Sequence, residues 1–286
     1  MELRWDYTTC TDYRTLEPCY QRFNQLTNGS NSSTFPISKS PCVCHITASL
    51  THGIPWNVFL YYGIENMYQS YLPYSESVDD QQMYGRLNGT KGACGELTAR
   101  NSTPYAPCGL MANSLFNDTI ELYRVIEHPT VSRLCCSGLP TKLSLTFQKG
   151  QFLLRVPLFR TGITWTPKYA VKNPPVPKTC PAGEPPLKCA FNGTIPPPNW
   201  LRPIWELDPT DPENNGYANE HLQSWLRFAP FRSFRRLYGR VDHLHRTPAP
   251  NKEAVKFFNK ELPNGTYVFS ITYSMWSAVR SGSSVR

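Results

Sequence analysis

Apolar positions cluster near both ends of this 286-residue chain in patterns that predict β-strands. Val43–Leu50, Trp56–Tyr62 and Gly265–Tyr273 are rich in β-branched and aromatic residues, which favours strands. Lys142–Phe147 and Gln151–Phe159 flank a turn signal at residues 148–150 and predict a hairpin. Because strands lie at both ends with helices between them, the first and last strands are expected to pair.

Three segments have helical spacing instead. Ile64–Tyr71 places its apolar residues along one helical face. Asn219–Phe228 and Ser233–His243 predict two more helices, separated near Pro230. Residues 173–198 hold nine prolines and predict an irregular insertion, and the polar stretch 75–107 predicts a surface excursion.

These patterns predict an α+β, β-rich fold with an antiparallel β-sandwich-like core and helical and Pro-rich insertions. We expect one domain over residues 1–286, with 173–198 inserted within it. Aromatic residues make up 13% of the chain, which argues against disorder. The 27 prolines are scattered without a period, which excludes collagen and disfavours a helical bundle.

Ten cysteines and seven glycosylation sequons indicate the secretory pathway. Chance would give about 3 sequons at this composition. The acceptors are Asn28, Asn31, Asn88, Asn101, Asn117, Asn192 and Asn264. The first ten residues do not resemble a signal peptide, and the best apolar stretch, 152–159, is far shorter than the roughly 20 residues of a membrane span. We therefore expect an ectodomain without its anchors.

The run PCGLMANSLFNDT at residues 107–119 resembles the signature of the cell division control protein 50 family, the β-subunits of phospholipid flippases. Further matches follow in the family's order, at residues 59–69, 79–81, 162–165, 199–203, 225–227 and 234–239. The resemblance extends from about Cys10 to Tyr273. It implies a large extracytoplasmic domain between two membrane spans, at the plasma membrane or in the endoplasmic reticulum, Golgi or endosomes.

The resemblance also implies a noncatalytic partner of a type-IV P-type ATPase, which forms a heterodimer with the pump and supports its folding, export and activity. No cofactor is implied beyond N-linked glycans, and Asn117 is a position where the family commonly carries one. The alternative is a cell-surface receptor or adhesin that uses the same domain to bind a ligand. A signal peptide without a second membrane span in the full gene would favour that alternative.

For the cysteines, the resemblance implies the pairs Cys10–Cys44, Cys19–Cys42 and Cys94–Cys108. The remaining four, Cys135, Cys136, Cys180 and Cys189, have no counterpart in the common family pattern and indicate a divergent lineage. Adjacent cysteines rarely bond to each other, so Cys135 and Cys136 are each expected to reach into the Pro-rich insertion. Zinc binding by Cys42, Cys44 and His45 is the alternative, but the second ligand pair of a zinc site is missing.

A calcium site is a candidate at residues 208–216. Asp211, Glu213 and Asn215 are spaced like the first ligands of an EF-hand loop. Position twelve of that loop needs a bidentate glutamate, and here it is Leu222. A tight turn with side-chain capping explains the same residues and is favoured.

The chain has a net charge of +8, and its C-terminal half contains one strongly basic cluster. Its members are Arg227, Arg232, Arg235, Arg236 and Arg240. Aromatic residues lie between these arginines, as on a nucleic-acid surface, namely Phe228, Phe231, Phe234 and Tyr238. The i, i+3, i+7 spacing of the aromatic residues instead predicts a half-buried helix with a solvated arginine face. The expected extracytoplasmic compartment also disfavours a nucleic-acid partner. Acidic loops of the pump, or phospholipid headgroups, are the expected partners of these arginines.

Catalytic patterns are absent from the sequence: it has no Gly-x-Ser-x-Gly, His-Glu-x-x-His or phosphate-binding loop motif. Isolated histidines and the adjacent carboxylates Asp79 and Asp80 do not form a recognisable acid–base pair. We therefore expect a binding protein with no enzymatic activity and no metal.

Overall fold

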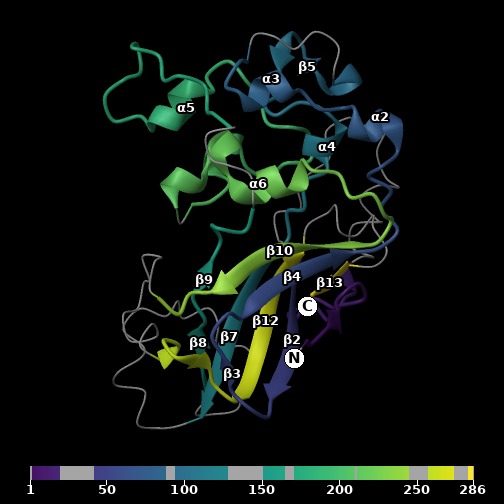
Figure 1. Ribbon diagram of the computed structural model, residues 1–286, viewed down its shortest axis with the longest axis vertical. Coiled ribbons are helices and arrows are strands. Elements are labelled where there is room, and N and C mark those ends of the chain that lie inside the picture. Colours follow the sequence, from purple (N-terminus) through teal and green to yellow (C-terminus); the bar gives the residue numbers. More distant parts are fainter. Residues whose placement is uncertain are drawn as a thin grey trace. The chain divides into compact units, whose positions relative to one another are not determined.

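The computed structural model describes residues 2–19, 42–87, 94–127, 151–164, 171–209, 211–244, 257–273 and 283–285 (Figure 1). The chain forms two compact units, each assembled from segments distant in sequence. Unit 1 contains residues 1–64, 118–159 and 237–286, and unit 2 contains residues 65–117 and 160–236. Whether the two units fold together as one domain stays a prediction.

A four-stranded antiparallel sheet forms the centre of unit 1, in the order β2-β12-β7-β8. The strands are Cys42–Leu50, Gly265–Tyr273, Thr119–Glu127 and Gln151–Arg155. The expected pairing of the first and last strands is confirmed, because β2 and β12 pair along their whole length. Tyr123, Val125, Leu153 and Val268 form a buried cluster on this sheet.

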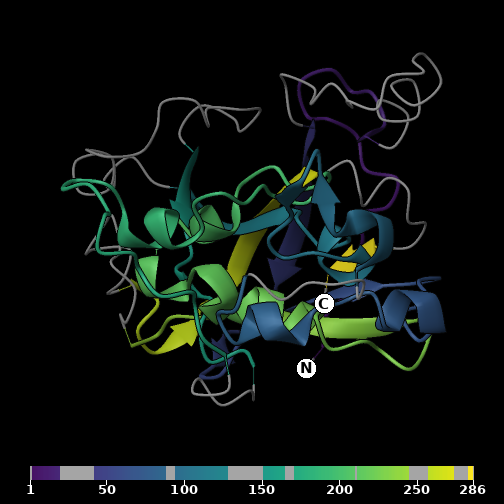
Figure 2. The same cartoon turned by 90° about the horizontal axis from the view of Figure 1, so that it is seen from above.

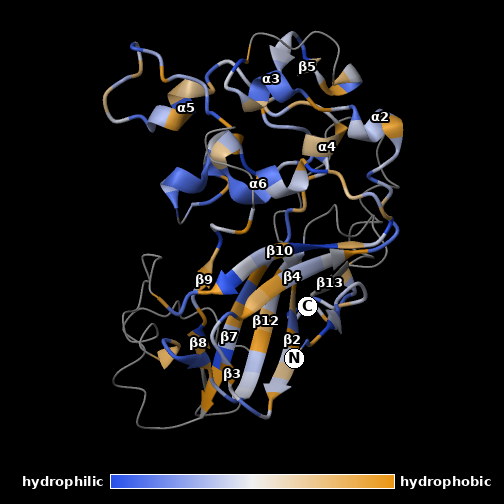
Figure 3. Ribbon diagram, viewed as in Figure 1, coloured by the Kyte–Doolittle hydropathy of each residue, from blue (hydrophilic) through white to orange (hydrophobic). Residues whose placement is uncertain are grey.

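The second sheet of unit 1 has the order β1-β13-β4-β10-β9. Its strands are Trp5–Asp6, Ser283–Val285, Phe59–Ile64, Phe234–Val241 and Leu158–Phe159. The hydroxyl of Tyr238 in β10 accepts a hydrogen bond from the Ile120 amide of β7 over 2.9 Å. Trp5 packs on Phe269 with ring centroids 5.0 Å apart. These contacts join the two sheets, as expected for a β-sandwich-like core, and apolar residues line β4 and β12 (Figure 3).

Unit 1 contains two further strand pairings outside those described above. The pairing of β1 with β13 brings the first and last described strands together. A separate ribbon joins β3, Ile54–Pro55, to β11, Glu261–Leu262. The predicted strand 142–147 and its turn lie outside the described residues, and the predicted strand 151–159 is present as the two pieces β8 and β9.

The helix predicted over 233–243 is wrong, because this segment is the strand β10. The helical spacing counted Phe228 and Phe231, which precede the strand and are exposed. Arg240 and Val241 pair with Phe159 and Leu158 of β9, and the ring of Tyr238 meets that of Tyr62 in β4 edge-on. Pairing with neighbours on both sides overrides a local helical pattern, since strand formation depends on tertiary context.

Unit 2 consists of short helices joined by irregular segments. Its α-helices are α2 Leu72–Ser75, α3 Asp80–Met83, α4 Leu110–Asn113, α5 Pro186–Ala190 and α6 Glu220–Trp225. Its 3₁₀ helices are η1 Gly95–Leu97, η5 Ile204–Glu206, η6 Pro212–Asn214 and η7 Gly216–Ala218. A two-stranded ribbon pairs β5, Ala99–Arg100, with β6, Thr103–Pro104. The helix α6 lies within the segment predicted over 219–228, whereas the predicted insertion is irregular except for α5.

The predicted helix over 64–71 is also wrong. Asn66 has a positive φ of 58°, which interrupts a right-handed helix. The Met67 amide donates outward to the Arg232 carbonyl, so it is not used within a helical turn. The helix α2 begins only at Leu72, with a proline in its first turn, where the missing amide proton costs nothing.

The predicted surface excursion over 75–107 is partly interior, because Gln82, Cys94 and Tyr105 are buried. Among the described residues, no helix combines the length and apolar character needed to cross a bilayer.

Candidate functional site

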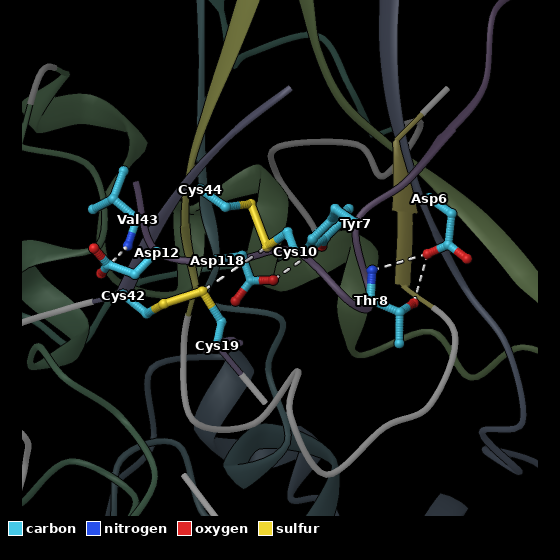
Figure 4. Close-up of a disulfide and its surroundings, with 10 residues drawn as sticks. All are labelled: Asp6, Tyr7, Thr8, Cys10, Asp12, Cys19, Cys42, Val43, Cys44 and Asp118. Carbon is cyan, nitrogen blue, oxygen red and sulfur yellow. Dashed lines mark hydrogen bonds between the residues drawn. A yellow bond between two sulfur atoms is a disulfide. The ribbon is translucent and has the colours of Figure 1, made fainter. Parts of the chain in front are cut away.

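Two nested disulfides fasten the N-terminal segment to the start of β2 (Figure 4). Cys10 is bonded to Cys44 and Cys19 to Cys42, with Cα–Cα distances of 5.9 and 5.8 Å. These are the pairs that the family resemblance implies. They hold a segment with little regular structure against the central sheet of unit 1.

The same bonds remove the zinc alternative, since Cys42 and Cys44 are not available as thiolate ligands. The third proposed ligand, His45, stacks on Tyr13 with ring centroids 4.6 Å apart. Burial lowers the pKa of His45, and the nearby Asp12 carboxylate opposes this shift. These residues therefore serve packing.

A buried hydrogen bond near the two nested disulfides also holds the N-terminal segment in place (Figure 4). The Tyr7 hydroxyl donates to the Asp118 carboxylate over 2.9 Å, and both side chains are buried. The Tyr273 ring meets that of Tyr7 edge-on, with centroids 5.8 Å apart. Burial raises the pKa of Tyr273, and the carboxylates of Asp118 and Asp6 raise it further. The signature residue Asp118 therefore stabilises unit 1.

The rest of the signature, residues 107–117, lies in unit 2, where most of these residues are buried. Cys108 is bonded to Cys94, the third pair that the resemblance implies, with a Cα–Cα distance of 5.7 Å. The buried Gln82 accepts from the Cys108 amide over 2.9 Å and donates to the Tyr105 carbonyl over 3.0 Å. One glutamine side chain thus fixes the backbone on both sides of residues 106–107.

Two tryptophans bind the carbonyls of α4. The Trp200 indole donates to the Ala112 carbonyl over 2.7 Å, and the Trp225 indole donates to the Met111 carbonyl over 2.9 Å. Met111 and Ala112 are almost inaccessible to solvent. Because α4 has only four residues, these side-chain donors satisfy carbonyls that a longer helix would satisfy itself.

A half-buried histidine, His221, contacts the end of the signature. The His221 ring lies 3.0 Å from the Phe116 carbonyl, which accepts a hydrogen bond from Nε2. Burial lowers the pKa of His221 to about 4, and the charges of Arg160 and Arg236 contribute in the same direction. The histidine is therefore neutral at pH 7, and its hydrogen bond is structural.

The calcium candidate is organised as a turn. Asp211 accepts from the Glu213 amide and caps η6. Asn215 binds both the amide and the carbonyl of Asp208, at 2.7 and 2.8 Å, and Asn214 donates to the Asp208 carboxylate. These side chains are used within the loop, and the described residues contain no cluster of three potential metal ligands.

The cysteines of the insertion are bonded to each other. Cys180 and Cys189 form a disulfide with a Cα–Cα distance of 5.7 Å, so the expectation that they pair with Cys135 and Cys136 is wrong. A disulfide nine positions apart closes a short loop, which costs less chain entropy than a distant pairing. Cys135 and Cys136 lie outside the described residues.

Four of the seven sequons lie within the described residues. Asn101, Asn192 and Asn264 are exposed. Asn117 is half-buried, its amide nitrogen faces the Asn199 carbonyl at 3.4 Å, and its amide oxygen is buried without a hydrogen-bond partner. The other acceptors, Asn28, Asn31 and Asn88, lie outside the described residues.

The five predicted partner-binding arginines have different surroundings. Arg236 is half-buried in unit 2, where its guanidinium donates to Ser224, Arg227 and Gln69. In unit 1, Arg240 lies over the Phe159 ring at 4.8 Å. Arg227 is half-buried, whereas Arg232 and Arg235 are exposed. Partner binding through these arginines stays a prediction, and Arg232 and Arg235 are the ones most accessible to a partner.

One group of residues was not identified from the sequence. Tyr68, Tyr71 and Leu72 are 61 to 65% exposed, although the predicted helix assigned Tyr68 and Tyr71 to an apolar, core-facing side. Asn66 is the signal that could have identified them, because asparagine readily adopts the left-handed backbone conformation. Its positive φ interrupts a right-handed helix before Tyr68.

The paired carboxylates Asp79 and Asp80 have a structural role. Asp79 caps α3 by accepting from the Gln81 amide over 2.8 Å, while Asp80 is exposed in the first turn. An acidic first turn complements the partial positive charge of a helix N-terminus.

Comparison with known proteins gives a consistent picture. The profile of the LEM3 (ligand-effect modulator 3) family / CDC50 family matches residues 1–279. Cell cycle control protein 50A of Bos taurus is 35% identical over 244 residues, covering 82% of this chain and 55% of that protein. Cell cycle control protein 50B of Homo sapiens is 34% identical over 240 residues, covering 82% and 57%. Cell cycle control protein 50C of Macaca fascicularis is 32% identical over 246 residues, covering 85% and 59%. The chain thus spans little more than half the length of these relatives.

Proposed function

This chain belongs to the LEM3/CDC50 family, and from that premise we propose that it is the extracytoplasmic part of a noncatalytic β-subunit of a type-IV P-type ATPase phospholipid flippase. The observation that carries this proposal is the family match over residues 1–279, together with about one-third identity to three named relatives. The nested disulfides of unit 1 and the Cys94–Cys108 bond of unit 2 support it, because they are the cysteine pairs that the family resemblance implies.

The proposed work of the domain is to bind the exofacial loops of the pump and to support its folding, its export from the endoplasmic reticulum and its activity. Phosphorylation and lipid movement belong to the pump in this account. Two of the described histidines have structural contacts: His45 stacks on Tyr13, and His221 is hydrogen-bonded to the Phe116 carbonyl. These contacts are consistent with a binding role. The proposed location is a cell membrane with this domain on the extracellular or lumenal side, carrying N-linked glycans.

Affinity purification of the full-length protein, followed by mass spectrometry, tests this proposal. A type-IV P-type ATPase should be recovered at near-equal amount with the tagged protein. A matched sample carrying Cys10→Ser and Cys44→Ser should recover less pump, because the N-terminal segment loses its attachment to β2. If the eluate contains membrane receptors or ligands but no P-type ATPase, the receptor alternative replaces this proposal.

A further inference from the structure

A glycosylation sequon of unit 2 lies at the turn of a two-stranded ribbon (Figures 1 and 2). We call residues 99–104, which form β5, the turn and β6, the sequon ribbon. Arg100 of β5 pairs with Thr103 of β6, so Asn101 and Ser102 are the two turn residues. Their φ angles are 49° and 65°, and positive φ at both central residues is typical of a type I′ turn. The acceptor asparagine is therefore part of the turn itself.

Contacts at the base of the sequon ribbon hold its two strands together. The Cys94–Cys108 disulfide encloses the ribbon. The Tyr105 amide donates to the Thr98 carbonyl over 3.0 Å. Cys94, Tyr105 and Cys108 form one buried cluster, and the side chain of Ile195 packs against this cluster. Because a two-stranded ribbon alone is only marginally stable, the sequon ribbon depends on the disulfide and on this cluster to remain closed.

These contacts become available at different times during synthesis. Cys108 follows Asn101 by seven positions, whereas Ile195 follows it by 94. The Ile195 carbonyl accepts from the Ala106 amide over 2.9 Å, and the Ile195 amide donates to the Pro104 carbonyl over 3.0 Å. At about 5–20 residues per second, Cys108 is made within about 2 s of Asn101, and Ile195 roughly 5–20 s after it. Disulfide formation takes seconds or longer, so the sequon spends a period on an open chain.

Glycan transfer requires this open chain. The transferase recognises the asparagine amide together with the hydroxyl of the Ser/Thr two positions later, so it has to enclose the backbone between them. In the sequon ribbon, Thr103 is half-buried and belongs to the paired strand β6. Presenting it to the transferase would require the ribbon to open against the contacts at its base. Asn101 is exposed in the closed ribbon, so a glycan that is already attached is accommodated there.

We propose that Asn101 receives its glycan only before the sequon ribbon closes, so that glycan transfer competes with formation of the Cys94–Cys108 disulfide. In transfer, the Asn101 Nδ2 bonds to the anomeric carbon of a lipid-linked oligosaccharide and loses a proton, and the lipid diphosphate leaves with the electron pair of the broken bond. In closure, the two thiols lose two protons, and their two electrons reduce the disulfide of a lumenal oxidoreductase to a dithiol. A chain that forms the disulfide first keeps an unmodified Asn101. This inference rests on the lumenal location in the proposed function and goes beyond it, because it sets the order of two covalent steps.

Mass spectrometry of the full-length protein from cells measures the ratio of glycosylated to unmodified Asn101. Cys94→Ser with Cys108→Ser should raise this ratio to near-complete glycosylation, because the ribbon stays open. The readout does not depend on folding, since protein retained in the endoplasmic reticulum is measured as well.

Two substitutions at Ser102 test the same competition and keep the sequon intact. Ser102→Gly relieves the left-handed backbone of a non-glycine residue and favours the closed turn about fivefold, so the ratio should fall by up to that factor. Ser102→Val puts a β-branched residue at positive φ, which disfavours the turn, so the ratio should rise.

Three controls accompany these variants. In protein that also carries Cys94→Ser and Cys108→Ser, the two Ser102 variants should have equal ratios, which separates turn closure from a preference of the transferase for the middle residue. Cys180→Ser with Cys189→Ser removes the disulfide of the Pro-rich insertion and should leave the ratio at Asn101 unchanged. The glycosylated fraction of Asn264 in the same molecules is the internal reference for the Ser102 variants and should stay constant.

The proposal is overturned if removing the Cys94–Cys108 bond does not raise the ratio and Ser102→Gly does not lower it. It is also overturned if Asn101 carries no glycan in any variant. Absence of glycans from every sequon would overturn the lumenal location as well. A ratio that changes as expected, in a protein that recovers no P-type ATPase, would contradict the subunit role and leave this inference standing.

Discussion

Tyr7 and Asp118 share a buried hydrogen bond of 2.9 Å across 111 positions of the sequence. The bond joins the N-terminal segment to the residue that precedes β7, within the signature run. The N-terminal segment is therefore attached to the rest of unit 1 by two disulfides and by a hydrogen bond to the Asp118 carboxylate. The two kinds of attachment can be separated by substitution.

Tyr7→Phe removes the hydroxyl and leaves the Asp118 carboxylate buried without this donor. We expect the free energy of unfolding to fall by about 1.5–3 kcal/mol, the range for a hydrogen bond to a charged group. Urea unfolding of the disulfide-intact chain measures it. The control is Tyr84→Phe, which changes an exposed tyrosine and should stay within about 0.5 kcal/mol. Equal values for the two variants would show that the bond contributes no stability.

Gly109→Ala should be far more damaging than Gly183→Ala. Both glycines have a positive φ, of 96° and 95°, so both substitutions carry a similar backbone penalty of about 1–2 kcal/mol. A Cβ at Gly109 would lie 2.1 Å from the Ser77 carbonyl oxygen, whereas a Cβ at Gly183 meets nothing within 4 Å. Secretion yield and urea unfolding compare the two. Similar losses would mean that residues 77 and 109 can separate at little cost.

His221 makes stability depend on pH. Its folded pKa of about 4 lies below the ordinary 6.5, so the unfolded chain binds the proton more readily between these values. The contribution is complete above pH 6.5 and is lost as the pH falls toward 4, by up to about 3 kcal/mol. This is an upper limit, since part of the side chain remains accessible.

His221→Gln is the matched variant, because a glutamine amide can still donate to the Phe116 carbonyl. Urea unfolding at about pH 7 and about pH 4.5 should show a smaller loss in the variant than in the unchanged chain. Parallel losses in both proteins would assign the acid sensitivity to other groups.

The Asn117 side chain is expected to contribute to folding separately from any glycan it carries. Its amide faces the Asn199 carbonyl, so Asn117→Gln should cost about 1 kcal/mol even in protein made without glycosylation. Thr119→Ala removes the same sequon, but Thr119 is exposed and should cost little. If both variants unfold like the unchanged chain when unglycosylated, the side chain has no structural role.

Two core strands could be predicted from sequence because their own residues have a high β-strand propensity. Gly265–Tyr273 and Val43–Leu50 combine β-branched and aromatic residues, and the two strands pair along their whole length. The strand Phe234–Val241 could not be predicted in the same way, because three of its eight residues are arginines and its own sequence carries a weak strand signal. Its aromatic spacing matched a helix, and only the neighbouring strands decide against that pattern.

The candidate site shows the same division. The disulfide pairs Cys10–Cys44 and Cys19–Cys42 followed from the family resemblance, while the Cys180–Cys189 bond depends on a local turn that proline-rich sequence does not specify. The arginine cluster was visible in the sequence, but the inward direction of Arg236 depends on Gln69, 167 positions away. Side-chain direction on irregular segments comes from such distant contacts.

Lipid uptake by cells is the most direct test of the central claim that this protein is a flippase subunit. Cells that make the full-length protein would have its gene removed, and uptake of fluorescent phosphatidylserine, phosphatidylethanolamine and phosphatidylcholine would be measured before and after restoring it. We predict that inward movement of at least one of these lipids is lost on removal and returns with the unchanged protein, while a type-IV P-type ATPase is retained in the endoplasmic reticulum in its absence. Unchanged uptake of all three lipids, with every such pump reaching its normal membrane, would contradict the account.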